Sequence, residues 1–413
     1  MRLLHVTHQY RPAIGGSEKY MADLSEELAR RGHKVDVASS RAKSVQTWQT
    51  ELPAFEQLNG VNIHRFRSLA RHRYTWHILN FGNDRYRRTG RWWYEPCIFF
   101  GNGPVIPGLA WHILRYGRRY DLIHIQTLPY FHFVYAYLCT RVVGRPVVLT
   151  PHIHADQLQV FDLPSFNAIL RGADMVIVVS EREVSYLTAR GVDSKRIFVT
   201  RHGIKLSELP YLDLQECRTR LEIPSDAFVL LFLGRKVAYK GLQTVLAAFA
   251  QLQSHYPSLY LVSAGPPTEH SRHLARKYEG LTHWIDLDTV NDAQKVDLLN
   301  ACDVLLLPST GEAFGIVFLE AWTVGKPVIG ARAGAIPSVI LEEHDGLLVN
   351  PGDVAELARA IERLIAQPEL SHRLALNGQR KVRQHHTVER IVDQIEDGYR
   401  HVLEKRHAYP VSH

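Results

Sequence analysis

Cysteine is scarce in this chain of 413 residues, and long apolar runs are missing. The four cysteines lie far apart, with no C-x-x-C pair: Cys97, Cys139, Cys217 and Cys302. Their spacing excludes a zinc ribbon or a dense disulfide framework and is typical of a protein in a reducing cytosol. No apolar run approaches the roughly 18–20 residues of a membrane-spanning helix, and the start at Met1 is too short and polar for a signal peptide. We therefore expect a cytoplasmic protein.

Extremes of composition are also lacking. Hydrophobic residues make up 46% of the chain and charged residues 22%, with a net charge of +7. This ordinary globular mixture excludes wholesale disorder and collagen-like repeats. The length suits two or three domains of ~100–200 residues each, large enough to bury a core without disulfide or metal support.

One segment has almost no negative charge. Residues 61–120 contain eleven arginines, no lysine and two acids, Asp84 and Glu95, so their net charge is +9 and the rest of the chain is slightly acidic. The same residues hold four of the seven tryptophans: Trp76, Trp92, Trp93 and Trp111. Arginine beside aromatic rings favours peripheral contact with an anionic membrane, where cations are attracted and aromatic rings lie at headgroup depth. The alternatives are a phosphorylated acceptor, a solvated basic face with tryptophans in the core and, least favoured, single-stranded nucleic acid.

Short apolar runs alternate with amphipathic, helix-length stretches through most of the chain, which is the pattern of parallel βαβ units. In the first half the expected strands are residues 3–6, 35–38, 122–125, 147–149 and 175–179. In the second half they are residues 229–233, 259–264, 283–287, 304–307, 327–330 and 346–349. The first helix is expected over Ser17–Arg31, with Ser17 as its N-cap and Gly32 ending it.

The pattern stops and restarts at a mixed, loop-like stretch near residues 205–225. We expect a Rossmann-like N-terminal domain over residues 1–206, which includes the basic segment 61–120. A Rossmann-like C-terminal domain is expected over residues 207–413, with a final helix at 389–404. The expected fold is therefore α/β, with two doubly wound domains that face a deep interdomain cleft. Such sheets bind ligands beyond the carboxyl ends of their strands.

Two glycines follow the first expected strand. Gly15 and Gly16 precede the first helix, where glycine lets the backbone approach a ligand and the helix N-terminus presents free amides. The pair indicates a phosphate or diphosphate site, and an ordinary tight turn explains it equally well. No G-x-G-x-x-G follows any strand, so the dinucleotide-binding fingerprint is absent.

A second candidate phosphate site follows the expected strand at 229–233. Arg235 can make a bidentate fork to phosphate oxygens, and Lys240 adds a mobile charge where the next helix opens. A strand's carboxyl end and a helix start converge on one place, so both cations are expected there. Solvated surface is the alternative.

The sharpest pattern is Pro308–Ala321, which follows the buried run 304–307. Glu312 lies in the loop, and Glu320 lies about one turn into the next helix. Two carboxylates at one helix N-terminus can bind the hydroxyls of a sugar and a ribose, while free amides near Phe314–Ile316 face a phosphate. From spacing alone, a capping role for Glu312 with an exposed Glu320 is an equal alternative.

These two glutamates have seven residues between them, inside Gly-Glu-Ala-Phe-Gly-Ile-Val-Phe-Leu-Glu-Ala. This resembles the E-x7-E signature of retaining glycosyltransferase family 4, which has the GT-B fold. The resemblance runs through nearly the whole chain. The family's other motifs occur in its order: Gly15-Gly-Ser-Glu18, Arg31-Gly-His-Lys-Val-Asp-Val, Tyr120-Asp-Leu-Ile-His124, Gly144-Arg-Pro-Val-Val-Leu-Thr-Pro-His152 and Leu233-Gly-Arg235…Lys240-Gly.

The resemblance implies a role for each candidate in the N-terminal, acceptor-binding domain. Gly16, with Gly15 beside it, would approach the donor diphosphate or the acceptor. His152 would lie near the donor sugar and take part in catalysis. Without the resemblance, His152 is simply a histidine in a loop.

In the C-terminal, nucleotide-sugar-binding domain, Arg235 and Lys240 would bind the diphosphate and stabilise the leaving nucleotide. Glu312 would hold sugar hydroxyls beside the anomeric carbon, and Glu320 would bind the ribose. The backbone amides of three residues would face the sugar or the phosphate: Phe314, Gly315 and Ile316. The segment Thr282–Asp288 would lie against the nucleobase.

The resemblance also implies a mechanism without a metal or other cofactor. Because no protein nucleophile is evident, the departing phosphate would help to deprotonate the acceptor hydroxyl on the front face. Glu312 as a covalent nucleophile is the less favoured version.

The sequence departs from the family's pattern in two places. One is the interdomain loop, where the family's Asn-Gly-Val-Asp is replaced by His202-Gly-Ile-Lys205. The other is segment 61–120, which matches no motif of the family.

Other interpretations use different residues. Asp286-Leu-Asp288 matches the metal-binding D-x-D of GT-A enzymes, although we expect a strand end there, and His152-x-His154 lacks a third ligand with recognisable spacing. A GT-B epimerase or phosphorylase would share the architecture, and a non-catalytic scaffold could bind a membrane or nucleic acid through the basic segment. E-x7-E with the Arg235/Lys240 pair favours sugar transfer over all of these.

The predicted function is therefore retaining, nucleotide-sugar-dependent glycosyl transfer, with a UDP- or GDP-sugar as the favoured donor. The acceptor is expected to be a lipid-linked or cell-envelope glycan at the inner membrane face, with a soluble small molecule as the alternative. We expect the protein to be cytoplasmic and to contact the membrane peripherally through residues 61–120.

Overall fold

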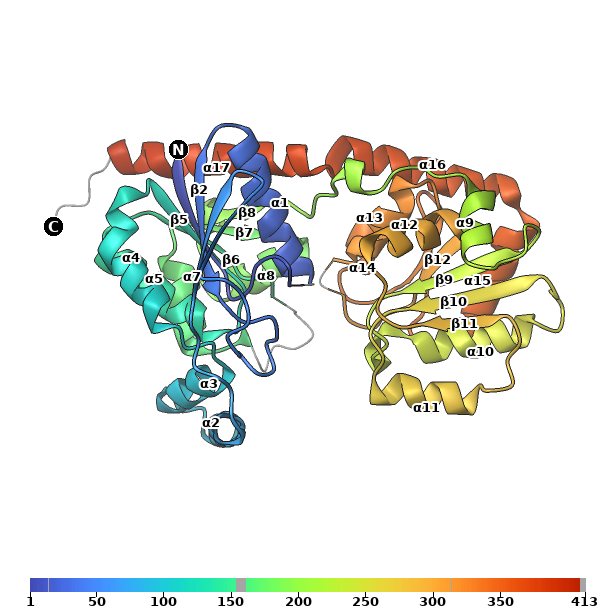
Figure 1. Cartoon of the computed structure of the whole chain (residues 1–413), viewed down its shortest axis with the longest axis horizontal. Coiled ribbons are helices and arrows are strands. Elements are labelled where there is room, and N and C mark those ends of the chain that lie inside the picture. The colour runs from blue at the N-terminus through green and yellow to red at the C-terminus, as the bar shows by residue number, and fades with distance from the viewer. Residues whose placement is uncertain (14, 154–160, 313, 409–413) are drawn as a thin grey trace. The chain divides into compact units, whose positions relative to one another are not determined.

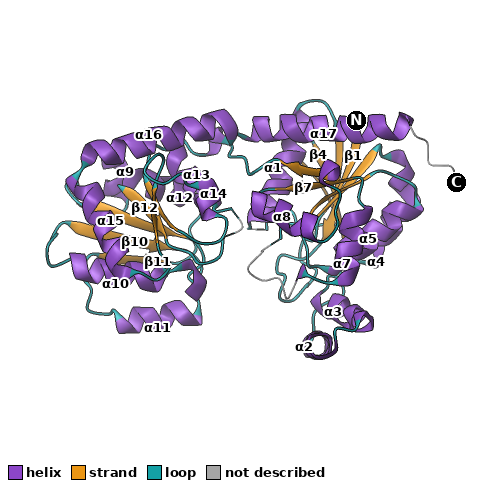
Figure 2. Cartoon of the chain, turned by 180° about the vertical axis from the view of Figure 1, so that it is seen from behind, coloured by secondary structure: helices purple, strands orange, loops and turns teal. Residues whose placement is uncertain are grey.

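The computed structural model describes residues 1–13, 15–153, 161–312 and 314–408, and it consists of two compact α/β units (Figure 1). The first unit contains Met1–Gly203 and the last helix, α17 (Val388–Ala408). The second unit is Ile204–Thr387. In each unit helices cover both faces of a sheet (Figure 2). The expected architecture of two doubly wound parallel-sheet domains is confirmed.

Among the described residues, the sheet of the first unit has the strand order β3-β4-β2-β1-β5-β6-β7-β8. Only the edge strand β3 is antiparallel to its neighbour; the other pairs are parallel. The strands are β1 (Arg2–Val6), β2 (Lys34–Ser40), β3 (Phe55–Leu58), β4 (Val61–Phe66), β5 (Leu122–Gln126), β6 (Val147–Thr150), β7 (Met175–Val178) and β8 (Ile197–Val199). Central strands such as β7 are buried at every residue, which explains why they appear in the sequence as continuous apolar runs.

The helices of the first unit include a cluster inside the basic segment, between β4 and β5. They are α1 (Gly16–Arg30), α2 (Arg73–Thr89), α3 (Glu95–Asn102), α4 (Pro107–Tyr116), α5 (Phe131–Val142), α7 (Pro164–Gly172) and α8 (Glu181–Ala189), with the 3-10 turns η1 (Trp92–Tyr94) and η2 (Gly117–Arg119). The expected N-cap Ser17 is wrong, because α1 begins at Gly16 with Gly15 as its cap, and the Ser17 hydroxyl donates to Glu18 Oε2 instead. Gly32 follows the helix with φ of +89°, as expected for a stop residue.

Helix α17 corrects the expected assignment of residues 389–404 to the second domain. The helix packs against α1 in the first unit, where Ile391, Ile395 and Tyr399 are buried in one apolar cluster with Met21 and Leu28. An amphipathic pattern indicates that a helix has a buried face, but it does not identify the sheet that the face covers. The unit boundary lies between Gly203 and Ile204, three residues before the expected one.

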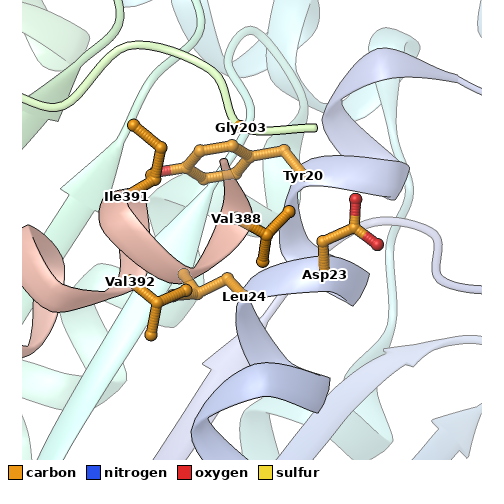
Figure 3. A pocket seen from close by; sticks show the side chains of 7 residues that line it. All are labelled: Tyr20, Asp23, Leu24, Gly203, Val388, Ile391 and Val392. Carbon is orange, nitrogen blue, oxygen red and sulfur yellow. The ribbon is translucent and has the colours of Figure 1, made fainter. Parts of the chain in front are cut away.

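A small pocket lies between α1 and α17 (Figure 3). Its lining is mostly apolar, and the carboxylate of Asp23 points away from the apolar side chains, toward Arg11 and Lys19. The residues that line it are Tyr20, Asp23, Leu24, Gly203, Val388, Ile391 and Val392. A Cβ on Gly203 would stand 2.9 Å from the Val388 Cα, so glycine allows the two chain segments to pass closely. The pocket belongs to the packing of α17.

The described sheet of the second unit is entirely parallel, in the order β11-β10-β9-β12-β13-β14. Its strands are β9 (Phe228–Leu233), β10 (Leu259–Ala264), β11 (Trp284–Leu287), β12 (Val304–Leu307), β13 (Val328–Ala331) and β14 (Leu347–Val349). Its helices are α9 (Leu214–Arg220), α10 (Leu242–Leu252), α11 (Glu269–Lys277), α12 (Asp292–Ala301), α13 (Ile316–Thr323), α14 (Ile336–Val339), α15 (Val354–Ala366) and α16 (Pro368–His385). The strand order reverses between β9 and β12, so the loops after these two strands leave the sheet side by side.

No single helix in the described part of the chain is both long and apolar enough to cross a membrane. The bent pair Trp92–Asn102 and Pro107–Arg119, which turns by 103°, meets that test only when its two helices are taken together, by length and composition.

The polar contact that joins α17 to the first sheet yields a stability prediction. The Tyr399 hydroxyl lies 2.5 Å from Nδ1 of His124 and 3.4 Å from Nε2 of His5, all three side chains being buried. Burial lowers the pKa of His5 to about 3 and also lowers the pKa of His124, so both rings are neutral and depend on hydrogen bonds. Tyr399→Phe should lower the free energy of unfolding by about 1–3 kcal/mol in urea unfolding, because a buried ring nitrogen loses its partner.

Tyr211→Phe is the matched control, since that side chain is 78% exposed. It should change stability by less than about 0.5 kcal/mol. Equal effects of the two substitutions would contradict the proposed anchoring role of Tyr399.

Candidate active site

The loops after β9 and β12 meet at the point where the strand order of the second unit reverses. The Thr310 N–H donates to the carbonyl of Tyr239 at 2.8 Å, and the Ser309 hydroxyl donates to the same oxygen at 3.1 Å. Arg235 and Lys240 come from the first of these loops, and Glu312 comes from the second. The site predicted from the sequence is therefore assembled where a doubly wound sheet presents its ligand-binding edge.

Two glycines permit this close meeting of loops. Gly241 has φ of +84°, and a Cβ there would be in hard contact with the carbonyl of Pro308. Gly315 has φ of +88° and is the N-cap of α13, so its left-handed backbone turns the loop into the helix. Any other residue at either position would be strained.

Glu312 and Glu320 are each held by a lysine. Lys240 donates through Nζ to Glu312 Oε1, and these side chains are only 15% and 10% exposed. Lys295, from α12, donates to Glu320 Oε1 at 2.9 Å. The sequence analysis did not identify Lys295, and no motif marks it; its position on α12 near the start of α13 became visible only in the fold. The capping role that spacing allowed for Glu312 is replaced by an ion pair, and Glu320 is buried rather than exposed.

The remaining predicted donor residues lie around these pairs. Arg235 is exposed, and its guanidinium donates to the Tyr239 hydroxyl at 2.8 Å. Phe314 is 4% exposed, with its ring 5.7 Å from that of His386, so its side chain packs in the unit. Gly315 and Ile316 form the start of α13, where backbone amides of a first helical turn point outward. The residues predicted for an anion and for sugar hydroxyls thus occupy one edge of one sheet.

Lys236 follows Arg235 in the loop that the sequence marks as a candidate phosphate site, but the structure gives it a supporting role that the sequence did not indicate. Its side chain is fully buried and donates to Asp286 Oδ1 at 2.5 Å and to the Leu287 carbonyl at 2.6 Å. Asp286 also accepts from Ser263, and the Lys236 carbonyl accepts from the Thr268 hydroxyl at 2.6 Å. This contact of the buried Lys236 with the more exposed Asp286 fixes the loop that carries Arg235 against β11, which is the part of the chain expected at the nucleobase.

The contacts of Asp286 also bear on the alternative metal sites. Its carboxylate is engaged by Lys236 and Ser263, and Asp288 follows β11 directly. His154, of the His152-x-His154 pattern, lies outside the described residues. Within the described ranges, no group of three or more His, Cys, Asp or Glu side chains is arranged to hold a metal ion.

In the first unit the strand order reverses between β1 and β5, and Gly15 and Gly16 follow β1. The carboxylate of Glu18 lies directly over Gly15, where a Cβ would collide with it. His8 Nε2 is 3.0 Å from Glu18 Oε1; although burial opposes the shift, this contact lowers the pKa of Glu18 to about 2. An anion bound at Gly15 and Gly16 would therefore share this place with a carboxylate, which the glycine pattern alone did not indicate.

His152 follows β6 and faces the same edge of the first sheet. Its Nε2 is 3.4 Å from Gln126 Oε1, and its ring stacks at 6.1 Å on that of His202. The amide of Gln126 donates to Thr7 Oγ1 at 2.9 Å and to the Ser17 carbonyl at 3.0 Å. Gln126, which the sequence analysis missed, thus links His152 to the start of α1. The sequence feature that could have identified Gln126 is a polar residue at the end of a buried strand.

Residues 202–205, where the sequence differs from the family's Asn-Gly-Val-Asp, lie at the boundary between the two units. His202 belongs to the first unit, where its ring lies 5.4 Å from that of Tyr20. Lys205 belongs to the second unit, and its Nζ is 3.7 Å from Glu208 Oε1. The replacement of the family's acid by lysine is thus accompanied by a local acidic partner.

Glu183 supports the loop that carries His152. Its fully buried carboxylate accepts from the backbone N–H of Ile153 at 2.9 Å and from that of Val179 at 2.8 Å. Burial raises the pKa of Glu183 to about 7, against the pull of these hydrogen bonds. One carboxylate therefore ties together the loops after β6 and β7.

Comparison with known proteins accounts for both units. Residues 14–208 match the family described as Glycosyltransferase Family 4, and residues 214–381 match the family described as Glycosyl transferases group 1. A D-inositol 3-phosphate glycosyltransferase of Saccharomonospora viridis is 28% identical over 412 residues, covering 94% of this chain and 90% of the relative.

Solved structures are similar over almost the full length. A sucrose-phosphate synthase from Thermosynechococcus elongatus has a TM-score of 0.75 at 23% identity, covering 98% of this chain and 99% of its own. HepE of Anabaena, solved in complex with UDP-glucose, has a TM-score of 0.72 at 20% identity, covering 96% of this chain and 98% of its own. These likenesses confirm the expected fold.

The raised pKa of Glu183 predicts a pH-dependent stability. Between 4.5, its ordinary pKa, and about 7, the folded chain keeps a proton that the unfolded chain has lost. The proton on Glu183 therefore makes its full contribution to the free energy of unfolding below a pH of about 4.5, and this contribution is lost as the pH rises through 7. Glu183→Gln should flatten the fall in melting temperature between pH 5 and pH 8. The control is Glu181→Gln, an exposed carboxylate on the same helix. A slope in Glu183→Gln equal to that of the parent protein would refute the assignment.

Proposed function

The chain belongs to glycosyltransferase family 4, and from this premise we propose that it transfers a sugar from a UDP- or GDP-sugar to an acceptor hydroxyl with retention of configuration. The observation that carries the proposal is the pair of lysine-held glutamates at the reversal point of the second sheet, Lys240–Glu312 and Lys295–Glu320. Carboxylates and cations side by side suit a ligand that has hydroxyls next to a diphosphate. The complex of HepE with UDP-glucose supports this class of donor.

In the proposed binding mode, Arg235 and Lys240 bind the diphosphate. Arg235 reaches solvent and can form a bidentate contact, whereas Lys240 is nearly buried and supplies a focused charge. When Lys240 turns to the phosphate, its partner Glu312 is released to accept hydrogen bonds from the sugar hydroxyls. Glu320, kept in place by Lys295, accepts from the ribose.

The proposed chemistry uses the chain's own cations to stabilise the leaving nucleotide, so no metal or other cofactor is required. Positive charge at the diphosphate lowers the energy of the departing oxyanion. That phosphate oxygen then helps to take the proton from the attacking acceptor hydroxyl on the same face of the sugar. In the first unit, His152 would contact the donor sugar near its reacting carbon.

For the acceptor we propose a lipid-linked or cell-envelope glycan at a membrane surface, bound by the first unit. The arginine- and tryptophan-rich helices of residues 61–120 favour this choice. A soluble small-molecule acceptor is the second candidate, favoured by the similarity to the D-inositol 3-phosphate glycosyltransferase. A non-catalytic scaffold would have no need for two lysine-held glutamates beside an exposed arginine.

The roles of Glu312 and Lys240 can be separated by substitution. Glu312→Ala should reduce nucleotide release from the donor in the presence of an acceptor at least about 100-fold, because sugar contacts in the transition state are lost. Nucleotide binding measured by calorimetry should remain. Lys240→Ala should weaken both nucleotide release and nucleotide binding, since a charge-assisted contact to phosphate is removed.

Donors for this test are UDP-glucose and GDP-mannose, with a bacterial membrane lipid extract and soluble inositol phosphate as acceptor sources. Glu343→Ala is the control, because it breaks an ion pair of the same unit with Arg363 far along the chain from the predicted motifs. Parent-like turnover in Glu312→Ala, or equal losses in Glu343→Ala, would refute the assigned role.

A further inference from the structure

Helices α2 and α3, joined by the turn η1, form a helical hairpin over residues 73–102 that projects from the first unit (Figure 1). The two helices cross at glycines. A Cβ on Gly82 would stand 2.9 Å from the Cys97 Cβ, and one on Gly101 would stand 2.6 Å from the Leu79 backbone nitrogen. The two helices are thus in close backbone contact. Ile98 and Phe99 are buried in the core of the first unit, and several other large side chains of the hairpin are left outside this packing.

Those large side chains lie in solvent. Gly82 is the one buried residue of α2. The exposed aromatic residues of the hairpin are Tyr74 (64%), Trp76 (44%), Phe81 (50%), Trp92 (62%), Trp93 (51%) and Phe100 (41%). A soluble protein rarely leaves so many large rings together on one projecting element without a partner. The tryptophans of residues 61–120 therefore do not form a core, and the interpretation of this segment as a solvated basic face over buried tryptophans is wrong for the hairpin.

Positive charge is interleaved with these rings. The hairpin has five exposed arginines: Arg73, Arg85, Arg87, Arg88 and Arg91. Three of their guanidinium groups lie over aromatic rings: Arg73 at 5.0 Å from Tyr74, Arg85 at 5.5 Å from Phe81 and Arg91 at 5.0 Å from Trp93. The only exposed acid is Asp84, which pairs with Arg88 at 2.9 Å, because Glu95 is buried and accepts from the Ser165 N–H.

Four of the exposed residues of α2 share a face. At 3.6 residues per turn, Tyr74, Phe81, Arg85 and Arg88 point to the same side of the helix, about a quarter of a turn from Gly82. Exposed aromatic rings with guanidinium groups beside them, on an element that projects from the unit, suit binding to anionic headgroups and to the acyl chains beneath them. A nucleic-acid strand instead requires a positively charged groove that follows its backbone. The charge and shape of the surface favour the membrane.

The hairpin also stands at the functional edge of its sheet. It follows the carboxyl end of β4, and its exit is tied to the start of α5 by the Phe131 N–H donating to the Gly103 carbonyl at 2.6 Å. Arg71, just before α2, lies over both Trp76 (4.4 Å) and Trp48 (5.9 Å). Trp48 contacts the rings of His8 and Tyr130, which follow β1 and β5. Aromatic contacts thus run from the hairpin to the edge where the acceptor is expected.

We propose that the hairpin surface, made by the exposed aromatic residues and arginines of residues 73–102, docks the protein on an anionic phospholipid membrane. Docking at this edge holds the first unit with its acceptor-binding side against the bilayer. The inference deepens the proposed lipid-linked acceptor and rests on the proposed function only for that choice. Membrane binding itself requires neither donor nor acceptor, so it can be tested separately from sugar transfer.

The test is co-flotation of the full-length protein with vesicles of phosphatidylcholine alone or with about one third phosphatidylglycerol, at low and high ionic strength. The parent protein should bind the anionic vesicles, and high salt should release it. Arg87→Glu with Arg88→Glu should weaken binding at least about tenfold. Trp92→Ser with Trp93→Ser should also weaken binding, and that part of the effect should persist at high salt.

Arg118→Glu with Arg119→Glu is the matched control. It makes the same change of net charge at two exposed arginines of η2, which precedes β5 and so lies at the opposite edge of the sheet. Binding by this variant should stay within about twofold of the parent protein. Melting temperatures confirm that each variant is folded.

Three results would overturn the proposal. One is absence of binding to anionic vesicles by the folded parent protein. A second is equal loss of binding in the η2 control, which would indicate general electrostatics rather than a docking surface. The third is retention of vesicle binding in the hairpin variants together with loss of binding to a fluorescent single-stranded oligonucleotide, which would assign the surface to nucleic acid.

Discussion

The ion pair between Lys240 and Glu312 is the interaction on which the chemistry proposed for the second unit depends. Two charges that are nearly buried must be paired, since either alone would be strongly destabilising. The pair therefore holds the loops after β9 and β12 together while no ligand is present. In the proposed function, it also keeps a cation and a carboxylate where a diphosphate and a sugar would contact them. A bound donor would then replace each of the two charges as the partner of the other.

The supporting contacts explain why the loops meet with this geometry. Gly241 lets the first loop approach Pro308, and the contact of the buried Lys236 with Asp286 anchors the same loop to β11. In the first unit, Gln126 and Glu183 serve the equivalent purpose for the loop of His152. Both units thus use buried polar side chains to position the loops that carry the predicted site residues.

Much of this organisation could be predicted from the sequence. The fully buried strands appear as apolar runs, and the motifs around Glu312 placed a site at the carboxyl end of β12. Strands β3, β4 and β8 were missed because none is a continuous buried run. No residue of β3 or β8 is fully buried, and β4 alternates buried with partly buried residues. The placement of α17, and the partners Lys236 and Lys295, depend on contacts between segments far apart in the chain. Local pattern contains no information about such contacts.

The measurement that tests the central claim most directly is a thermal-shift titration of the full-length protein with UDP, GDP and ADP, with and without EDTA. A nucleotide that binds only the folded chain raises its melting temperature by mass action. The account predicts a clear increase with UDP or GDP that EDTA leaves unchanged, because the cations of the site are Arg235, Lys240 and Lys295. No increase with any nucleotide, or an increase that EDTA abolishes, would contradict it.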